Sequence, residues 1–240
     1  MKLDYTQYYR HWHDDSPTHL AAMIRYYGDR IAPHLPAAKD TRVLDVGCGP
    51  GFALEALRAL GVNQIEGIDP DAGQVAAAQA QQRPVTEVEE TNAWLRAHPG
   101  QFGVILLLDV LEHLPPERQL DLLAALNGAL AHGGRLICSV PNANSTLASR
   151  HRYNDWTHHA SFTEHSLRFA LYHGGFRDIA VWPDDGARVR LPWVPHWRRG
   201  WWYLRLLFRA VRRLQLMAEL GPADGRHAPL SLNLLGVATK

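Results

Sequence analysis

A short apolar run, a glycine-rich turn and an apolar-periodic helix follow one another over residues 42–60, and this succession constrains the fold more than any other feature. The turn carries glycines at three alternate positions, Gly47, Gly49 and Gly51. Glycines there let the backbone turn sharply and approach a ligand at the helix N-terminus. The segment therefore predicts a strand, a ligand-binding turn and a helix, the opening of a parallel α/β sheet.

Strand-like and helical segments alternate along the rest of the chain. We expect further strands at 64–68, 85–89, 102–108, 135–140, 176–182 and 230–239, and helices at 71–81, 116–130 and 163–173. Ser16 and Pro17 indicate a helix start within the first forty residues. The alternation predicts a Rossmann-like, doubly wound α/β fold of seven strands, mostly parallel, with ligands beyond the carboxyl ends of the strands.

The 240 residues are expected to form a single domain. Its parts are an N-terminal helical cap (1–40), a core (41–183 and 230–240) and a basic, tryptophan-rich insertion (184–229). The balance of 25 Lys and Arg against 24 Asp and Glu gives no chain-wide basic surface, so nucleic acid is not an expected partner. Two cysteines, no signal-like N-terminus and no membrane-length apolar stretch favour a cytoplasmic protein.

An acidic residue, Asp69, stands at the end of the second expected strand. A carboxylate at that place can accept hydrogen bonds from the hydroxyls of an adenosyl ribose. The turn does not match a dinucleotide fingerprint, because Phe52 stands where the third glycine would be, and it lacks the Gly-Lys-Ser/Thr of a P-loop. These features together favour an adenosyl ligand without a pyrophosphate.

Three segments, VLDVGCGPG at 43–51, ID at 68–69 and LDVLEH at 108–113, resemble the class I S-adenosylmethionine-dependent methyltransferases. The resemblance implies S-adenosyl-L-methionine as cofactor and an antiparallel last strand. It also implies that Asp69 binds the ribose and that Asn92, where the family often has Asp, lies with Ala93 against the adenine. The expected cofactor-binding residues are Asp45, Gly47, Cys48, Gly49, Gly51, Asp69, Pro70, Asn92, Ala93 and Asp109.

Methyl transfer to a hydroxyl needs a group that removes the proton, and histidines stand in two segments that follow strand ends. We expect His158 to be the general base, His159 to be second to it, and Asp155 to orient the imidazole. His113, after the fourth strand, is a further candidate.

The same long loop, 141–162, carries residues suited to holding an acceptor. Tyr153 and Trp156 are expected to stack on a sugar or aromatic ring, and Arg152 to bind its hydroxyls. The alternative is a loop folded over its own aromatic side chains.

The segments around Thr157-His158 and 162–176 are similar to small-molecule methyltransferases of bacterial surface-sugar clusters, and ubiquinone-pathway O-methyltransferases have a comparable Thr-His. The resemblance implies O-methylation of a sugar hydroxyl on a glycan or lipid-linked saccharide, in polysaccharide biosynthesis. The alternatives are a phenolic or quinone-type acceptor, or a non-catalytic membrane-associated scaffold.

A metal site is a further alternative at the segment after the fourth strand. Some quinone enzymes hold a divalent ion at a Glu-x-x-Glu-His motif, which Asp109, Glu112 and His113 match. Because Asp109 replaces a Glu and metal-free relatives share the motif, we expect no metal.

The insertion 184–229 contains nine arginines and four acidic residues, a local net charge of +5. From Trp201 onward its arginines fall on one helical face and its leucines on another. Residues 193–214 are thus expected either to bind an anionic membrane surface or to dock by the apolar stripe on the domain. The first interpretation makes the protein peripheral at the inner membrane face. The sequence carries no signal for an oligomeric state.

Overall fold

The computed structural model describes residues 13, 14, 16–185 and 196–240, with the backbone alone for residues 196–199. The expected membrane segment 193–214 therefore begins outside the described residues, and Trp193 lies there. Helix and strand bounds below refer to the described part of the chain.

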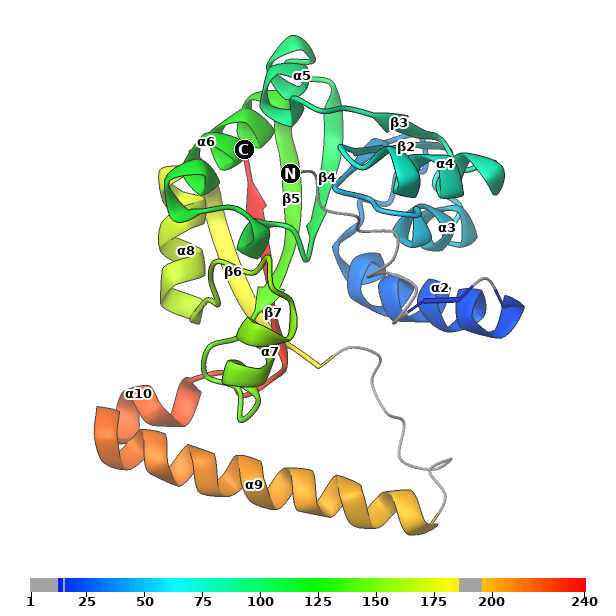
Figure 1. The fold of residues 1–240 in the computed structure, drawn as a ribbon. Coiled ribbons are helices and arrows are strands. Elements are labelled where there is room, and N and C mark those ends of the chain that lie inside the picture. The colour runs from blue at the N-terminus through cyan, green and yellow to red at the C-terminus, as the bar shows by residue number, and fades with distance from the viewer. Residues whose placement is uncertain (1–12, 15, 186–195) are drawn as a thin grey trace.

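Seven strands form one sheet in the order β3-β2-β1-β4-β5-β7-β6 (Figure 1). Their bounds are β1 Arg42–Val46, β2 Gln64–Asp69, β3 Val85–Glu87, β4 Phe102–Leu108, β5 Leu130–Pro141, β6 Arg177–Asp184 and β7 Asn233–Thr239. Strand β7 pairs antiparallel with both β5 and β6, and the other neighbouring strands pair in parallel. The expected fold class is confirmed, including the antiparallel last strand.

Helices cover both faces of the sheet because its central strands are apolar on both sides. In β4, Val104 and Leu106 pack with one set of helices, whereas Ile105 and Leu107 pack with the other. The first set is α2 (Pro17–Ile31), α3 (Phe52–Ala59) and α4 (Ala72–Ala80), and the second is α5 (Thr91–Ala97), α6 (Pro116–Ala129) and α8 (Glu164–His173). The ends of the helices follow local chemistry: the Ser16 hydroxyl caps α2 by accepting from the His19 N–H.

Short elements differ most from the sequence-based expectations. The helices α5, α7 (Ala148–Asn154) and α10 (Pro222–His227) were not expected, since six or seven residues are too few to show a helical period. Gly133 and Gly134 lie inside β5, because this strand begins directly after α6, where Leu130 pairs with Phe102.

The insertion contains the long helix α9 (His196–Leu220), which confirms the expected amphipathic helix. The insertion leaves the sheet after β6 and returns through α10 to β7 (Figure 1). Asn233, the first residue of β7, pairs with Asp184 on one side and Pro141 on the other. Both ends of the insertion are therefore attached at the carboxyl-terminal edge of the parallel strands. Within the described residues, no helix is both long and apolar enough to cross a bilayer.

Candidate active site

The turn after β1 adopts a conformation that requires glycine. Gly47, Gly49 and Gly51 have φ angles of 69°, 51° and 80°, in the left-handed region that other residues rarely adopt. A Cβ atom at Gly47 would also lie 2.6 Å from a methyl carbon of Val110. The turn therefore brings bare backbone to the N-terminus of α3, where N–H groups favour a polar ligand.

Asp69 fixes this turn to the end of β2. One carboxylate oxygen accepts the Gly49 N–H at 2.8 Å, and the other accepts the Asp71 N–H at 2.8 Å. Burial raises the pKa of Asp69, whereas these two N–H donors act against that rise. Each carboxylate oxygen keeps a further lone pair, so the group can also accept hydroxyls of a bound molecule.

A cavity of about 900 Å³ opens at the carboxyl ends of the strands. Seven of the expected cofactor-binding residues line it: Gly47, Gly49, Asp69, Pro70, Asn92, Ala93 and Asp109. Its position is the one expected for a doubly wound sheet.

Asp45, Cys48 and Gly51 do not line the cavity. Cys48 is buried against β2, and a Cβ atom on Gly67 would lie 2.6 Å from its sulfur. Burial, and secondarily the charge of Asp69, raises the pKa of Asp45 to about 7. They belong to β1 and the turn but not to the wall of the cavity.

One end of the cavity lies between α5 and α6. The Asn92 side-chain nitrogen donates to Asp121 at 2.6 Å, and Arg96 also pairs with Asp121. The Asn92 amide oxygen remains as an acceptor. Several lining residues here were missed in the sequence analysis, because they belong to or adjoin the short helix α5 or lie on α6: Glu89, Glu90, Arg96, Arg118 and Asp121.

His158 presents a nitrogen atom with a free lone pair to the other end of the cavity. Its Nδ1 lies 2.9 Å from the backbone oxygen of His151. Because a carbonyl oxygen only accepts hydrogen bonds, Nδ1 carries the proton of the neutral ring, and Nε2 keeps its lone pair. Among the described residues, Nε2 has no hydrogen-bond partner. Nε2 is therefore available to accept a proton.

Asp155 acts on a different histidine from the one expected. Its carboxylate accepts from the backbone N–H and the hydroxyl of Thr157, at 2.8 and 2.6 Å. Since that hydroxyl donates to Asp155, it accepts from His113 Nδ1, which lies 2.7 Å away. The prediction that Asp155 directly orients His158 is therefore wrong; a backbone carbonyl holds His158, and Asp155 reaches His113 through Thr157.

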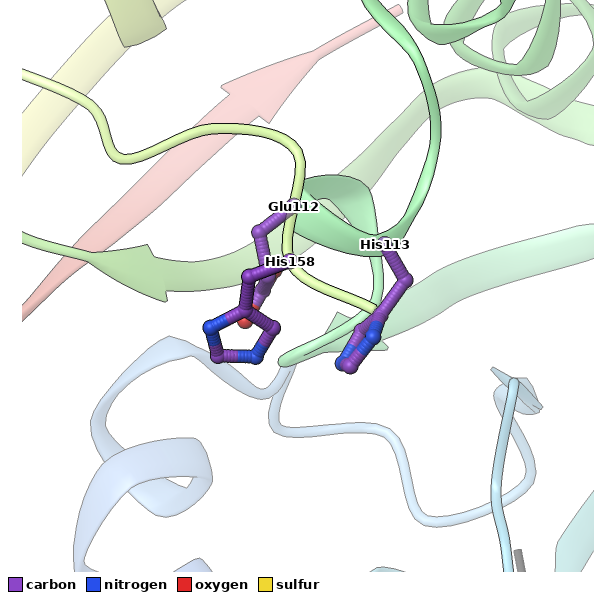
Figure 2. A group of neighbouring side chains, drawn as sticks. All are labelled: Glu112, His113 and His158. Atoms are coloured by element: carbon purple, nitrogen blue, oxygen red, sulfur yellow. The ribbon is translucent and has the colours of Figure 1, made fainter. Parts of the chain in front are cut away.

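His113 is held neutral. Burial, and secondarily the neighbouring His158, lowers its pKa to about 4. The two rings meet edge to face with centroids 4.6 Å apart (Figure 2). His113 therefore lines the cavity as an uncharged imidazole at neutral pH.

The remaining expected acceptor residues lie outside the cavity. Trp156 is 94% exposed and Tyr153 is 76% exposed, so these rings neither line the cavity nor pack under the loop. Arg152 lies over the Tyr153 ring at 5.1 Å. The backbone N–H of His159 donates to the backbone oxygen of Glu112 at 2.7 Å, while the His159 side chain is absent from the cavity lining.

Glu112, His113 and His158 each offer one metal-ligand atom, and these atoms lie within 4.8 Å of one another (Figure 2). The set replaces Asp109 of the expected motif with His158. Burial, followed by the charge of Asp109, raises the pKa of Glu112 well above its usual value, and one of its oxygens is buried without a partner. Two nitrogens and one oxygen are ligands that Zn²⁺ accepts.

The N-terminal region contributes two residues that the sequence analysis missed. His13 lines the cavity, with its ring 5.2 Å from that of Phe52. Arg30, on α2, is buried; its Nε donates to Asp184 at 2.6 Å, and its Nη1 lies 3.8 Å from Asp109. Arg30 thereby joins the end of β6 to the end of β4.

Residues 8–181 match a family described as a methyltransferase domain. A ubiquinone biosynthesis O-methyltransferase of Xanthomonas campestris pv. campestris is 34% identical over 55% of this chain and 56% of its own length. A tRNA U34 carboxymethyltransferase of Alcanivorax borkumensis is 36% identical over 45% of this chain and 34% of its own length. The match thus spans about a third to a half of these curated relatives.

Solved structures share the fold over nearly the whole chain. A SAM-dependent methyltransferase from Archaeoglobus fulgidus superposes with a TM-score of 0.68 at 19% identity, covering 99% of this chain and 100% of that one. A phosphoethanolamine N-methyltransferase 2 of Haemonchus contortus, in complex with S-adenosyl-L-methionine, has a TM-score of 0.58 at 15% identity, over 97% of this chain and 60% of that one.

Proposed function

This chain belongs to the methyltransferase domain family, of the class I S-adenosylmethionine-dependent type, and from that premise we propose that it methylates a hydroxyl group with His158 as general base. The observation that carries the proposal is the hydrogen bond from His158 Nδ1 to the His151 carbonyl oxygen, which leaves Nε2 as an acceptor at the cavity.

The residues present fit the cofactor. The glycine turn offers bare backbone, and a fixed carboxylate, Asp69, stands where ribose hydroxyls can bind. Asn92 offers an amide oxygen at the opposite wall, suited to an adenine amino group. When bound, S-adenosylmethionine supplies an electrophilic methyl group on a sulfonium.

The protein's part in the reaction is alignment and proton removal. An acceptor hydroxyl at the His158 end of the cavity would give its proton to Nε2 as its oxygen forms the bond to the methyl carbon and the carbon–sulfur bond breaks. His158 then becomes an imidazolium, with its positive charge delocalised over the ring. Its Nδ1–H stays hydrogen-bonded to the backbone oxygen of His151. The neutral His113 ring limits charge repulsion when His158 becomes cationic.

We place a sugar hydroxyl, on a glycan or lipid-linked saccharide, first among acceptors. The lining around His158 is polar, with His113, Asp109 and Asp155 nearby, which suits a ligand with several hydroxyls. The aromatic rings of Tyr153 and Trp156, expected to stack on either kind of acceptor, lie outside the cavity and do not distinguish the two.

A phenolic acceptor is the second candidate, because the ubiquinone biosynthesis relatives are O-methyltransferases by name. Glu112, His113 and His158 would be the residues to hold a divalent ion such as Zn²⁺, which as a Lewis acid would assist deprotonation of a hydroxyl.

The deciding experiment compares cells with and without the gene by mass spectrometry of surface glycans, lipids and quinones. A saccharide that becomes lighter by one CH₂ when the gene is lost supports the first acceptor. A quinone precursor with the same loss supports the second. If the purified protein binds S-adenosylhomocysteine yet no methylated compound is lost, the proposed turnover is wrong and a scaffold role is favoured.

A further inference from the structure

The long helix α9 exposes an apolar face to solvent. Among the described residues, nine of the sixteen exposed large apolar side chains belong to this helix. We define the outer face of α9 by five of them that share one side at helical spacing: Leu204, Leu207, Phe208, Val211 and Leu214, which are 43–66% exposed. An exposed apolar stripe of this kind marks an interaction surface.

Three arginines of α9, Arg205, Arg209 and Arg213, point the other way, toward the domain. Arg205 and Arg209 both pair with Asp185, just after β6, at distances of 2.7 and 2.8 Å. Arg213 donates to the backbone oxygens of Gly225 and Ala228, near α10. The alternative that the apolar stripe docks on the domain is therefore wrong.

The charge of the helix indicates what covers the outer face. Helix α9 contains six arginines and one acidic residue, Glu219. Asp185 is shared by two of these arginines, so the helix keeps a large positive charge. A second copy packed on the same face would bring two cationic helices together, whereas an anionic lipid surface would attract one.

Exposed aromatic residues support the same occupant. Trp201 is 69% exposed and Tyr203 is 61% exposed, both near the start of the outer face. Such rings favour the boundary between headgroups and acyl chains. Arg212, at the flank of the outer face, donates to Gln215 of the same helix and can reach the headgroup level by its long stem.

We propose that α9 binds an anionic lipid bilayer through its outer face, lying in the plane of the membrane. The insertion is attached at the carboxyl-terminal edge of the sheet, where the long loop 141–162 also begins. Binding by α9 therefore brings the edge of the sheet that carries the cavity close to the bilayer. On the proposed function, this gives the enzyme access to an acceptor anchored in lipid.

The test is flotation of the full chain with vesicles of phosphatidylcholine, alone or mixed with phosphatidylglycerol, at low and high salt. The wild type is expected to float with the mixed vesicles at low salt. Phe208→Gln should reduce the partition coefficient by about tenfold or more, because insertion of this ring is lost. Phe169→Gln on α8 is the matched control, since Phe169 is 63% exposed and Phe208 62%.

Three outcomes would overturn the proposal: no flotation of the wild type with mixed vesicles, undiminished flotation of Phe208→Gln, or an equal loss in Phe169→Gln. Sedimentation velocity of the same proteins tests the other occupant. A wild-type dimer that Phe208→Gln converts to a monomer, without vesicle binding, assigns the outer face to a second copy. Affinity for S-adenosylhomocysteine is measured in parallel, so failure of membrane binding is separate from failure of the proposed function.

Discussion

Asp69 connects the turn and the cavity through one carboxylate, and this gives the first test. Asp69→Ala should weaken S-adenosylhomocysteine binding strongly, since two charge-assisted hydrogen bonds of about 1.5 to 3 kcal/mol each would be lost. Part of the loss would come from release of the Gly49 N–H. Titration calorimetry measures it, with the exposed Asp29→Asn as control. An unchanged dissociation constant would mean that the adenosyl group binds elsewhere.

Proton removal by His158 gives the second test. His158→Ala should lower the rate of methyl transfer by about 100-fold to 10,000-fold while cofactor affinity stays the same. His159→Ala should retain turnover, because that side chain is outside the cavity. Dialysis against a chelator should leave the wild-type rate unchanged. Collapse of His113→Ala with survival of His158→Ala would move the base to His113, and loss of activity on chelation would favour the metal.

Asp45 gives a prediction for stability as a function of pH. Its pKa is about 7 in the folded protein and 3.8 in a free side chain, so the folded state binds the proton more tightly. The resulting stabilisation is complete below pH 4 and is lost as the pH rises toward 7, on the order of 4 kcal/mol. In urea unfolding, the free energy of unfolding of Asp45→Asn should therefore vary less with pH than that of the wild type over this range. The same pH dependence of the unfolding free energy in both proteins would contradict a buried, protonated Asp45.

At the scale of one element, the turn between β1 and α3 can be tested by comparing two glycines. Gly47→Ala meets both a strained φ and a clash with Val110, whereas Gly61→Ala meets a φ of 78° with no atom within 4 Å of the new Cβ. Both variants should lose about 1 to 2 kcal/mol in the free energy of unfolding from backbone strain. Gly47→Ala alone should also lose cofactor affinity. Equal cofactor affinity in the two variants would contradict a tight approach of the turn to the ligand.

The elements were predictable where their periodicity ran long enough. Strand β4, apolar throughout, and helix α6 were predicted to within a residue, because burial on both faces or on one stripe leaves a clear pattern. Helix α5 was not, and with it Arg96 and its pairing with Asp121 were missed. That contact depends on how two helices meet across the cavity, which no local pattern encodes.

At the scale of the whole molecule, the sequence predicted which strand ends carry the site but not the partners of each side chain. His158 was proposed from the loop pattern, whereas its holder, the carbonyl oxygen of His151, is a backbone atom that every residue possesses. His13 and Arg30 reach the site from the N-terminal region, across a separation in sequence that only the tertiary fold closes.

Two consecutive residues, Asp184 and Asp185, bind arginines from different parts of the molecule. Asp184 holds Arg30 beside Asp109 at the cavity, and Asp185 holds Arg205 and Arg209 of α9. A shift of α9 on lipid would pull on the same backbone step that positions Arg30. Thermodynamic reciprocity then applies: the factor by which vesicles change cofactor affinity must equal the factor by which cofactor changes vesicle affinity. On the proposed membrane binding, the end of β6 would therefore couple the free energy of lipid binding to the free energy of cofactor binding.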